Sequence, residues 1–241
     1  SLIAKEFRPR GGSSPVIRFF LGVFGMTGAL VFLGCPWRAI LRLAGGDFNA
    51  LFGIAGLAAG IALGVFFLKG GYSLGRAYKM KSLNGFILPA IMTLILLVLL
   101  LKIKPVPEGA LFLSEKGPGS MHASIILSLI AGTVTGILAQ RSRFCTVGAL
   151  RDVILAKDFH LLSGVGSLLI TAFVMNLILG QFHPGWEGQP VAHTNSIWNF
   201  LGMLLSGLSF ALAGGCPGRQ LFLSGEGDTD AGIFVLGMIA G

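Results

Sequence analysis

The sequence predicts an all-α integral membrane protein with about seven spans, inverted repeats and short re-entrant half-helices. Hydrophobic residues make up 54% of the chain and charged residues only 12%, whereas a soluble domain carries roughly 25% charged residues. Apolar runs of span length recur along the chain. A short cysteine motif occurs twice, each time between two apolar runs, and such self-similarity indicates an internal duplication.

Six apolar runs are each long enough for an α-helix to cross a hydrocarbon core of about 30 Å. They cover residues 16–34, 49–68, 85–101, 123–139, 161–179 and 197–213, and a seventh begins near Ala231. Residues 1–15 form a basic arm. We expect 16–241 to be one transmembrane domain, with repeat one at about 16–101 and repeat two at about 123–241. The chain begins at Ser1 and stops inside an apolar run, so we expect it to be truncated at both ends.

The repeated motif is Gly-Cys-Pro-x-Arg, at residues 34–38 and again at 215–219. When the two copies are aligned without a gap, the match continues downstream. Asp47 then aligns with Asp228, and Gly56 aligns with Gly237. A chance match would not keep this register, so we interpret the two stretches as copies of one ancestral unit.

Basic residues in the connections orient the spans. The N-terminal arm, segment 69–83 and segment 140–160 carry Lys and Arg, whereas segment 181–196 carries none. The positive-inside rule places the first three in the cytoplasm and segment 181–196 outside. The loop 102–122 falls outside by the same count, despite Lys102, Lys104 and Lys116. The two motif copies then have opposite orientations, which is typical of secondary transporters.

Residues 35–48 and 216–230 are too short and too polar to cross a membrane, and we expect each to form a turn followed by a half-helix. Pro36 and Pro217 suit the first helical position, which places Cys35 and Cys216 at the N-cap. A helix N-terminus carries about half a positive charge and unpaired N–H groups. Arg38 and Arg219 add a full charge in the first turn, so each thiol lies beside an electropositive pocket.

The third cysteine, Cys145, follows Arg143 and precedes Arg151, so it also combines a soft sulfur with nearby cations. Simpler interpretations remain open. A buried cysteine often only fills space, and some arginines serve as membrane anchors. We expect Asp47 and Asp228 to be structural partners of the half-helices. Two stripes of glycines predict close helix packing: Gly53, Gly56, Gly60 and Gly64, and Gly132 with Gly136.

Several kinds of site find no support in the sequence. Three cysteines without a C-x-x-C pair predict neither a disulfide framework nor a structural zinc site. The four histidines are scattered near loops, so we expect no metal and no other cofactor. The net charge of +8 falls in connections beside apolar runs and forms no exposed basic face with aromatics, so we expect no nucleic-acid partner.

The three cysteine elements together resemble those of the YeeE/YedE membrane proteins, a family that includes thiosulfate transporters and a selenium-associated branch. The elements are Gly34–Arg38, the run from Arg143 to Asp152, and Gly214–Arg219, in the family's order. The stretch GCPWRAILRLAGGD with GGCPGRQLFLSGEGD is most similar to the YedE branch. The resemblance covers essentially the whole chain.

The resemblance implies a transport domain that takes up a small sulfur- or selenium-containing anion through a cysteine-lined central path, and no enzyme. It places the protein in a prokaryotic cytoplasmic (inner) membrane, with the N-terminus in the cytoplasm. The residues expected along the path are Cys35, Cys145, Cys216, Arg38, Arg143 and Arg219. Those expected to support it are Gly34, Pro36, Asp47, Gly215, Pro217 and Asp228.

Two alternatives have different requirements. A membrane-embedded sulfur or selenium transferase would need an accessible thiolate that forms a covalent intermediate. A docking subunit for a soluble sulfur-carrier protein would use its basic cytoplasmic loops and tolerate loss of every cysteine.

Overall fold

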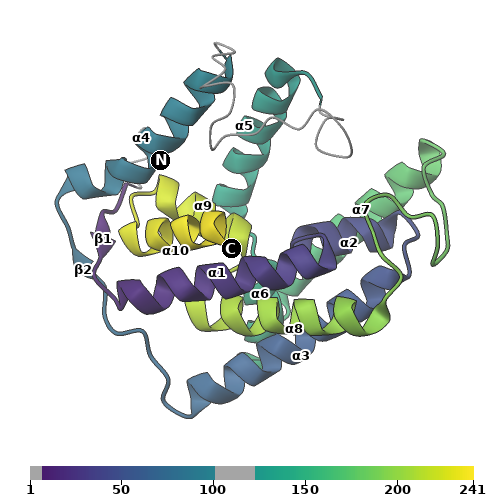
Figure 1. The fold of residues 1–241 in the computed structure, drawn as a ribbon, viewed down its shortest axis with the longest axis horizontal. Helices are drawn as coiled ribbons and strands as arrows, with labels where there is room; N and C mark the ends of the chain where they lie inside the picture. Colours follow the sequence, from purple (N-terminus) through teal and green to yellow (C-terminus); the bar gives the residue numbers. More distant parts are fainter. Residues whose placement is uncertain (1–6, 101–122) are drawn as a thin grey trace.

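The fold is almost entirely helical in the computed structural model, which describes residues 7–100 and 123–241 (Figure 1). The long helices are α1 (Pro15–Phe32), α3 (Asn49–Lys69), α4 (Ser82–Leu100), α5 (Ile125–Ser142), α7 (His160–Ile178) and α8 (Ser196–Ala213). The shorter helices are α2 (Pro36–Ala44), α6 (Thr146–Ala156), α9 (Pro217–Gly225) and α10 (Thr229–Ala240). Within the described ranges, the one sheet is an antiparallel pair, β1 (Arg10–Gly11) with β2 (Tyr78–Lys79).

The all-α membrane class is therefore confirmed. Six helical segments in the described ranges are long and apolar enough to cross a membrane, and α10 is a shorter apolar helix. Their positions agree with the six predicted runs and with the seventh run that begins near Ala231. Helix α7 has no buried residue, which suits a helix that faces lipid. The predicted loop 102–122 and the first six residues of the arm lie outside the described residues.

The unit of long helix, break, short helix and second apolar helix occurs twice, as α1–α2–α3 and as α8–α9–α10. The chain leaves α1 through Leu33, with φ of 62°, and leaves α8 through Gly214, with φ of 90°. Both residues are in the left-handed region, which ends a helix. The short helices α2 and α9 then begin at Pro36 and Pro217 and are followed by Gly45 and Glu226 at the C-cap. The predicted half-helices are thus present.

Equivalent glycines join the two units. Helix α3 packs closely on α8 because Gly56 has no Cβ. An added Cβ would collide with the carbonyl oxygen of Phe200. Helix α10 packs on α1 in the same way, with Gly237 against the carbonyl oxygen of Phe19. Phe200 and Phe19 are related by the same sequence offset as Gly56 and Gly237. Each unit therefore places its third helix on the first helix of the other unit.

The first helices of the two units are antiparallel. Arg18, near the start of α1, donates from Nη1 to the carbonyl oxygen of Ala213 at the end of α8, 3.4 Å away. His193, just before α8, contacts the carbonyl oxygen of Val31 near the end of α1 at 2.7 Å. The two units thus run in opposite directions, which is the relation expected of inverted repeats. The repeat boundaries at 16–101 and 123–241 remain a prediction.

Replacing Gly56 by leucine is expected to lower the melting temperature of the detergent-solubilised protein, because the new side chain must push α3 away from α8. Overpacking of this kind costs about 1–3 kcal/mol or more. Gly132→Leu is the matched control, because a Cβ at Gly132 meets no described atom within 4 Å. The packing expected at Gly132 and Gly136 is thus not seen among the described residues. Equal losses of stability in the two variants would contradict the role given to Gly56.

Candidate functional site

Three short helices begin at the three cysteines, and their N-termini converge. Cys35, Cys145 and Cys216 are the N-cap residues of α2, α6 and α9. The thiol of Cys145 caps its own helix, since the backbone N–H of Gly148 donates to Sγ at 3.2 Å. The sequence predicted two of these helices but not α6, because the stretch after Cys145 has no proline and no partner in the repeat.

Cys145 and Cys216 lie together where the N-termini of α6 and α9 meet. The backbone N–H of Cys216 donates to Sγ of Cys145 at 3.5 Å. The thiol of Cys145 therefore lies at the N-terminus of α9 as well as at that of its own helix. Both cysteines are buried, Cys35 is half-buried, and all three are free. The structure thus brings together two of the three predicted path cysteines in direct contact.

The element that contains Cys35 contacts the elements of Cys145 and Cys216 through the side chain of Trp37. The Trp37 ring lies 5.4 Å from that of Phe144, measured between centroids, and also packs against Gly218. Phe144 precedes Cys145, and Gly218 follows Cys216 by two residues. The first turns of α2, α6 and α9 therefore meet in one place.

Arg38 and Arg219 take the same position in the two units. A Cβ at Gly34 would lie 2.7 Å from Cδ of Arg38, and a Cβ at Gly215 would lie 3.1 Å from Cγ of Arg219. Each arginine stem thus folds back over the glycine that precedes the cysteine. These contacts explain both glycines structurally, and they keep the guanidinium groups near the helix N-termini.

A cationic cavity of about 230 Å³ lies at the α9 side of the meeting point. Its charged lining residues are Arg8, Arg10, Arg143, Arg219, Glu226 and Asp228. Arg10 binds Asp228, with Nε and Oδ2 2.6 Å apart. Arg8, Arg143 and Arg219 form no ion pair with another described residue. Two arginines of the arm and one from each of two cysteine elements thus share one site.

A second cavity, of about 490 Å³, lies at the α2 side. Its polar lining residues are Arg38, Arg42, Asp47, Asn176, Gln181, His183 and Gln189. Arg38 and Asp47 are the repeat equivalents of Arg219 and Asp228 in the first cavity. The two cavities therefore occupy equivalent places in the two units. The predicted path residue Arg38 lines one cavity, whereas Arg143 and Arg219 line the other.

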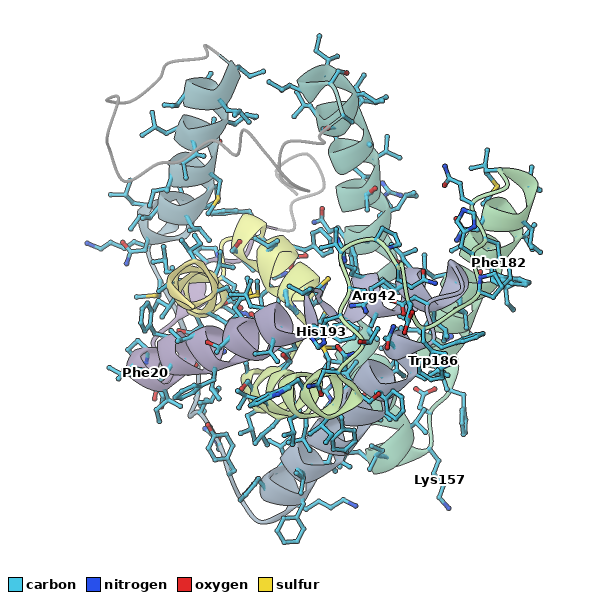
Figure 2. The ribbon with its side chains drawn as sticks, turned by 45° about the vertical axis from the view of Figure 1, so that its right-hand side comes forward. Phe20, Arg42, Lys157, Phe182, Trp186 and His193 are labelled. Carbon is cyan, nitrogen blue, oxygen red and sulfur yellow. The ribbon has the colours of Figure 1, made fainter. Side chains whose placement is uncertain are left out.

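Asp47 makes buried contacts at the end of α2. Its Oδ2 accepts from Nε of Arg42 at 2.6 Å, and both side chains are buried. Its Oδ1 accepts from the backbone N–H of Asn49 at the start of α3, at 2.9 Å. Asn49 in turn donates to the carbonyl oxygen of Trp186 at 2.6 Å, which holds the loop before α8 in place. Trp186 is labelled on this loop in Figure 2. Asp47 thus joins α2, α3 and this loop.

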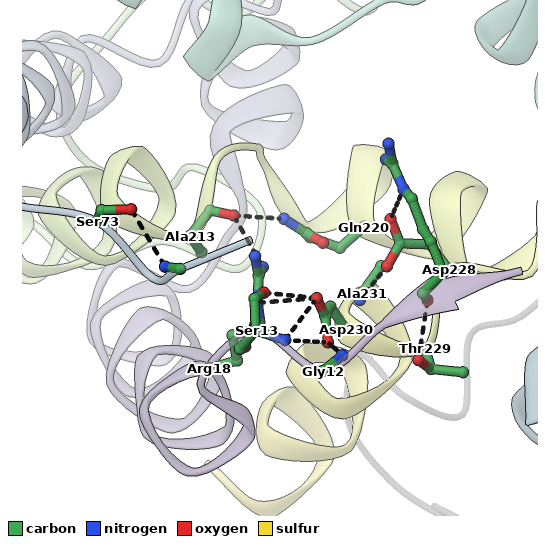
Figure 3. Close-up of polar contacts among 12 residues, drawn as sticks. Gly12, Ser13, Arg18, Ser73, Ala213, Gln220, Asp228, Thr229, Asp230 and Ala231 are labelled. Carbon is green, nitrogen blue, oxygen red and sulfur yellow. Dashed lines mark hydrogen bonds and ion pairs between the residues drawn. The ribbon is translucent and has the colours of Figure 1, made fainter. Parts of the chain in front are cut away.

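Asp228 is structural in a different way, because its partner comes from the N-terminal arm. It caps α10 by accepting from the backbone N–H of Ala231 at 3.1 Å and binds Arg10. Next to it, the buried carboxylate of Asp230 accepts from the backbone N–H of Gly12 at 2.8 Å and from the hydroxyl of Ser13 (Figure 3). Sequence reasoning missed Asp230, which fixes the arm against α10.

Four buried hydrogen-bond donors near the meeting point have no partner among the described residues. They are Nε1 of Trp37, Nε of Arg38, Oγ1 of Thr146 and Nη1 of Arg219. Each of these donors belongs to a residue that lies one to three positions after a cysteine. Buried donors are normally satisfied, so an unpartnered set beside three helix N-termini favours an anion as their ligand.

Comparison with known proteins agrees with this chemistry. Residues 141–241 match a family model described as sulphur transport. The chain is 34% identical to the thiosulfate transporter TsuA of Spirochaeta thermophila over 103 residues, which is 43% of this chain and 31% of that protein. It is 29% identical to the thiosulfate transporter TsuA of Escherichia coli over 108 residues, 44% of this chain and 30% of that protein. No solved structure matches.

The fold is that of an all-α membrane protein, and its residues 141–241 are similar to the sulphur-transport family. The matches confirm the resemblance to the YeeE/YedE family that the three cysteine elements predict. The chain matches less than a third of the length of these curated relatives. The family-model match includes Cys145 and Cys216 but not Cys35. The selenium-associated branch remains a prediction.

Proposed function

We propose that this protein carries a small sulfur-containing anion across the membrane, along a path that passes Cys35, Cys145 and Cys216. The observation that carries the proposal is the pair of cationic cavities at equivalent positions of the two inverted units. The cysteine-capped helix N-termini lie between Arg38, in one cavity, and Arg143 and Arg219, in the other. Inverted units with a site at their interface are the usual arrangement of secondary transporters.

The converging helices lower the cost of bringing an anion out of water. Dehydration of an ion costs several kcal/mol even after the protein relaxes. Each helix N-terminus supplies about half a positive charge, and three of them face the same place. Arg38 and Arg219 stand in the first turns of two of these helices and add full charges, so the site favours anions over cations.

The thiols suit a terminal sulfur. A thiol is a weak donor and a weak acceptor, and a polarisable sulfur matches it better than a strongly hydrated oxygen does. Thiosulfate carries such a sulfur beside an oxyanion, and an equivalent selenium compound carries a terminal selenium. We therefore propose a thiosulfate-like anion as the substrate. Compounds with a terminal selenium are the substrates to compare with thiosulfate.

More arginines are unpaired at the α9 cavity than at the α2 cavity, so we expect the anion to bind more tightly at the α9 end. We propose that the α9 end is cytoplasmic, as the basic arm and segments predict, and that the membrane is a prokaryotic cytoplasmic membrane. A soluble sulfur-carrier protein at this end remains the proposed partner.

The test of this function is uptake of labelled thiosulfate by the full-length protein in proteoliposomes, compared with empty liposomes. We expect saturable uptake. No uptake in folded protein would overturn the proposal. A reducible sulfur adduct on one cysteine, formed without uptake, would instead indicate a transferase.

Replacing Arg219 by glutamine is expected to raise the KM for the anion about tenfold. Loss of one hydrogen bond to a charged group costs about 1.5–3 kcal/mol, and about 1.4 kcal/mol corresponds to a factor of ten. Arg76→Gln is the matched control, since Arg76 is exposed in the connection after α3. Initial uptake rates at several thiosulfate concentrations measure both variants. An unchanged KM in Arg219→Gln would remove this arginine from the path.

A further inference from the structure

Trp37 and Gly218 break the symmetry of the repeat at the point where the two units meet. They occupy the same position of the Gly-Cys-Pro-x-Arg motif. A Cβ at Gly218 would lie 3.0 Å from Cζ2, 3.1 Å from Cη2 and 3.4 Å from Cε2 of Trp37. The indole of one unit thus fills the space that a side chain in the other unit would need.

Two more aromatic rings surround the Trp37 side chain. Its ring centroid lies 5.4 Å from that of Phe144 and 6.0 Å from that of Phe222. Phe144 directly precedes Cys145, and Phe222 lies on α9 beyond Cys216. Contacts from α2, α6 and α9 therefore form an aromatic cluster of Trp37, Phe144 and Phe222 at the meeting point.

Residues next to this cluster in the sequence line both cavities. The lining of the α2 cavity includes Arg38, directly after Trp37, and the lining of the α9 cavity includes Arg143 and Arg219. Neither lining includes Trp37 or any of the three cysteines. The two linings share no residue, so the two cavities are separate in this conformation.

The benzene edge of the indole faces the first turn of α9, since Cζ2 and Cη2 of Trp37 are the atoms closest to Gly218. Of the atoms closest to Gly218, Cε2 is bonded to Nε1. That Nε1 is buried and has no hydrogen-bond partner among the described residues. An indole N–H normally finds a partner when it is buried. Here the donor belongs to a ring that packs on Phe144, directly before Cys145, and on Gly218, two residues after Cys216.

We propose that Trp37 is the gate between the two cavities, and that its indole N–H binds the oxyanion end of the passing sulfur anion. The proposal rests on the proposed transport function. It identifies Trp37 as a specificity-determining residue, because the ring must move aside for each anion and then offers one donor to it. The ring excludes bulky or strongly hydrated anions.

Thiol accessibility tests the gate without relying on transport. A Cys35→Ser background leaves Cys145 and Cys216 as the reactive thiols of this chain. A membrane-impermeant thiosulfonate reagent, added to the α2 side of oriented vesicles, should label them at least tenfold faster after Trp37→Ala. Trp198→Ala is the matched control, because Trp198 is 55% exposed on α8 and lies outside the cluster. Equal labelling rates with and without Trp37→Ala would overturn the gate.

A milder variant separates the two roles of the indole and guards against misfolding. Trp37→Phe keeps an aromatic ring but removes the N–H, so the labelling rate should stay low while thiosulfate uptake falls about tenfold. Uptake unchanged in Trp37→Phe would overturn the role of the donor. The labelling rate could rise in Trp37→Ala while the wild-type protein transports no sulfur anion. That result would support the gate and overturn the proposed substrate.

Discussion

Alanine at Cys216 or Cys145 is expected to reduce thiosulfate uptake to between about a tenth and a hundredth of the wild-type rate. Both cysteines lie at the meeting point of the helix N-termini, and Sγ of Cys145 accepts a hydrogen bond from the backbone N–H of Cys216. A hydrogen bond to a charged group contributes about 1.5–3 kcal/mol, which is a factor of about 10 to 100. Initial uptake rates in proteoliposomes measure the loss.

Serine at the same positions separates the role of sulfur from that of space. A hydroxyl donates a hydrogen bond but is smaller and less polarisable than a thiol. We expect the serine variants to keep their stability but to lose most thiosulfate uptake. Melting temperatures close to that of the wild type provide the control. Full uptake in Cys145→Ala and Cys216→Ala would contradict a cysteine path, whichever anion is transported.

Removing the carboxylate of Asp47 is expected to destabilise the protein by about 3–5 kcal/mol, the usual cost of breaking a buried ion pair by deleting one partner. Asp47→Ala leaves the buried guanidinium of Arg42 unpaired and also removes the cap on α3. Thermal unfolding in detergent should show a lower melting temperature and a loss of uptake that follows the loss of folded protein.

Asp152→Ala is the matched control for this prediction. The pair between Arg151 and Asp152 is partly exposed, with side chains 32% and 30% accessible, and such pairs contribute about 0–1 kcal/mol. A melting temperature of Asp47→Ala as high as that of Asp152→Ala would show that Asp47 does not hold α2 and α3 together.

The sequence predicted the spans and the duplicated unit because both depend on local patterns. Runs of apolar residues set the helices, and the repeated motif marked Pro36 and Pro217 as helix starts. The third short helix was missed, since Cys145 is followed by Thr146 and has no matching copy. Helix α6 is recognised only from the structure, where the backbone N–H of Gly148 donates to the thiol of Cys145.

The site could be predicted by residue type but not by arrangement. The motif copies place Trp37 and Gly218 at the same position, yet nothing in the pattern shows that the two residues touch. Arg8 and Arg10 of the arm reach the α9 cavity only because Asp228 and Asp230 hold the arm in place. Such contacts join segments far apart in the chain, so they follow from the tertiary fold alone.

The most direct test of the central claim compares thiosulfate with sulfate as substrates of the wild-type, full-length protein in proteoliposomes. The two dianions differ by one terminal sulfur in place of oxygen. If thiols select the anion, labelled thiosulfate should enter much faster than labelled sulfate, and excess sulfate should barely inhibit its uptake. Equal rates for the two anions would contradict a path that recognises sulfur through Cys145 and Cys216.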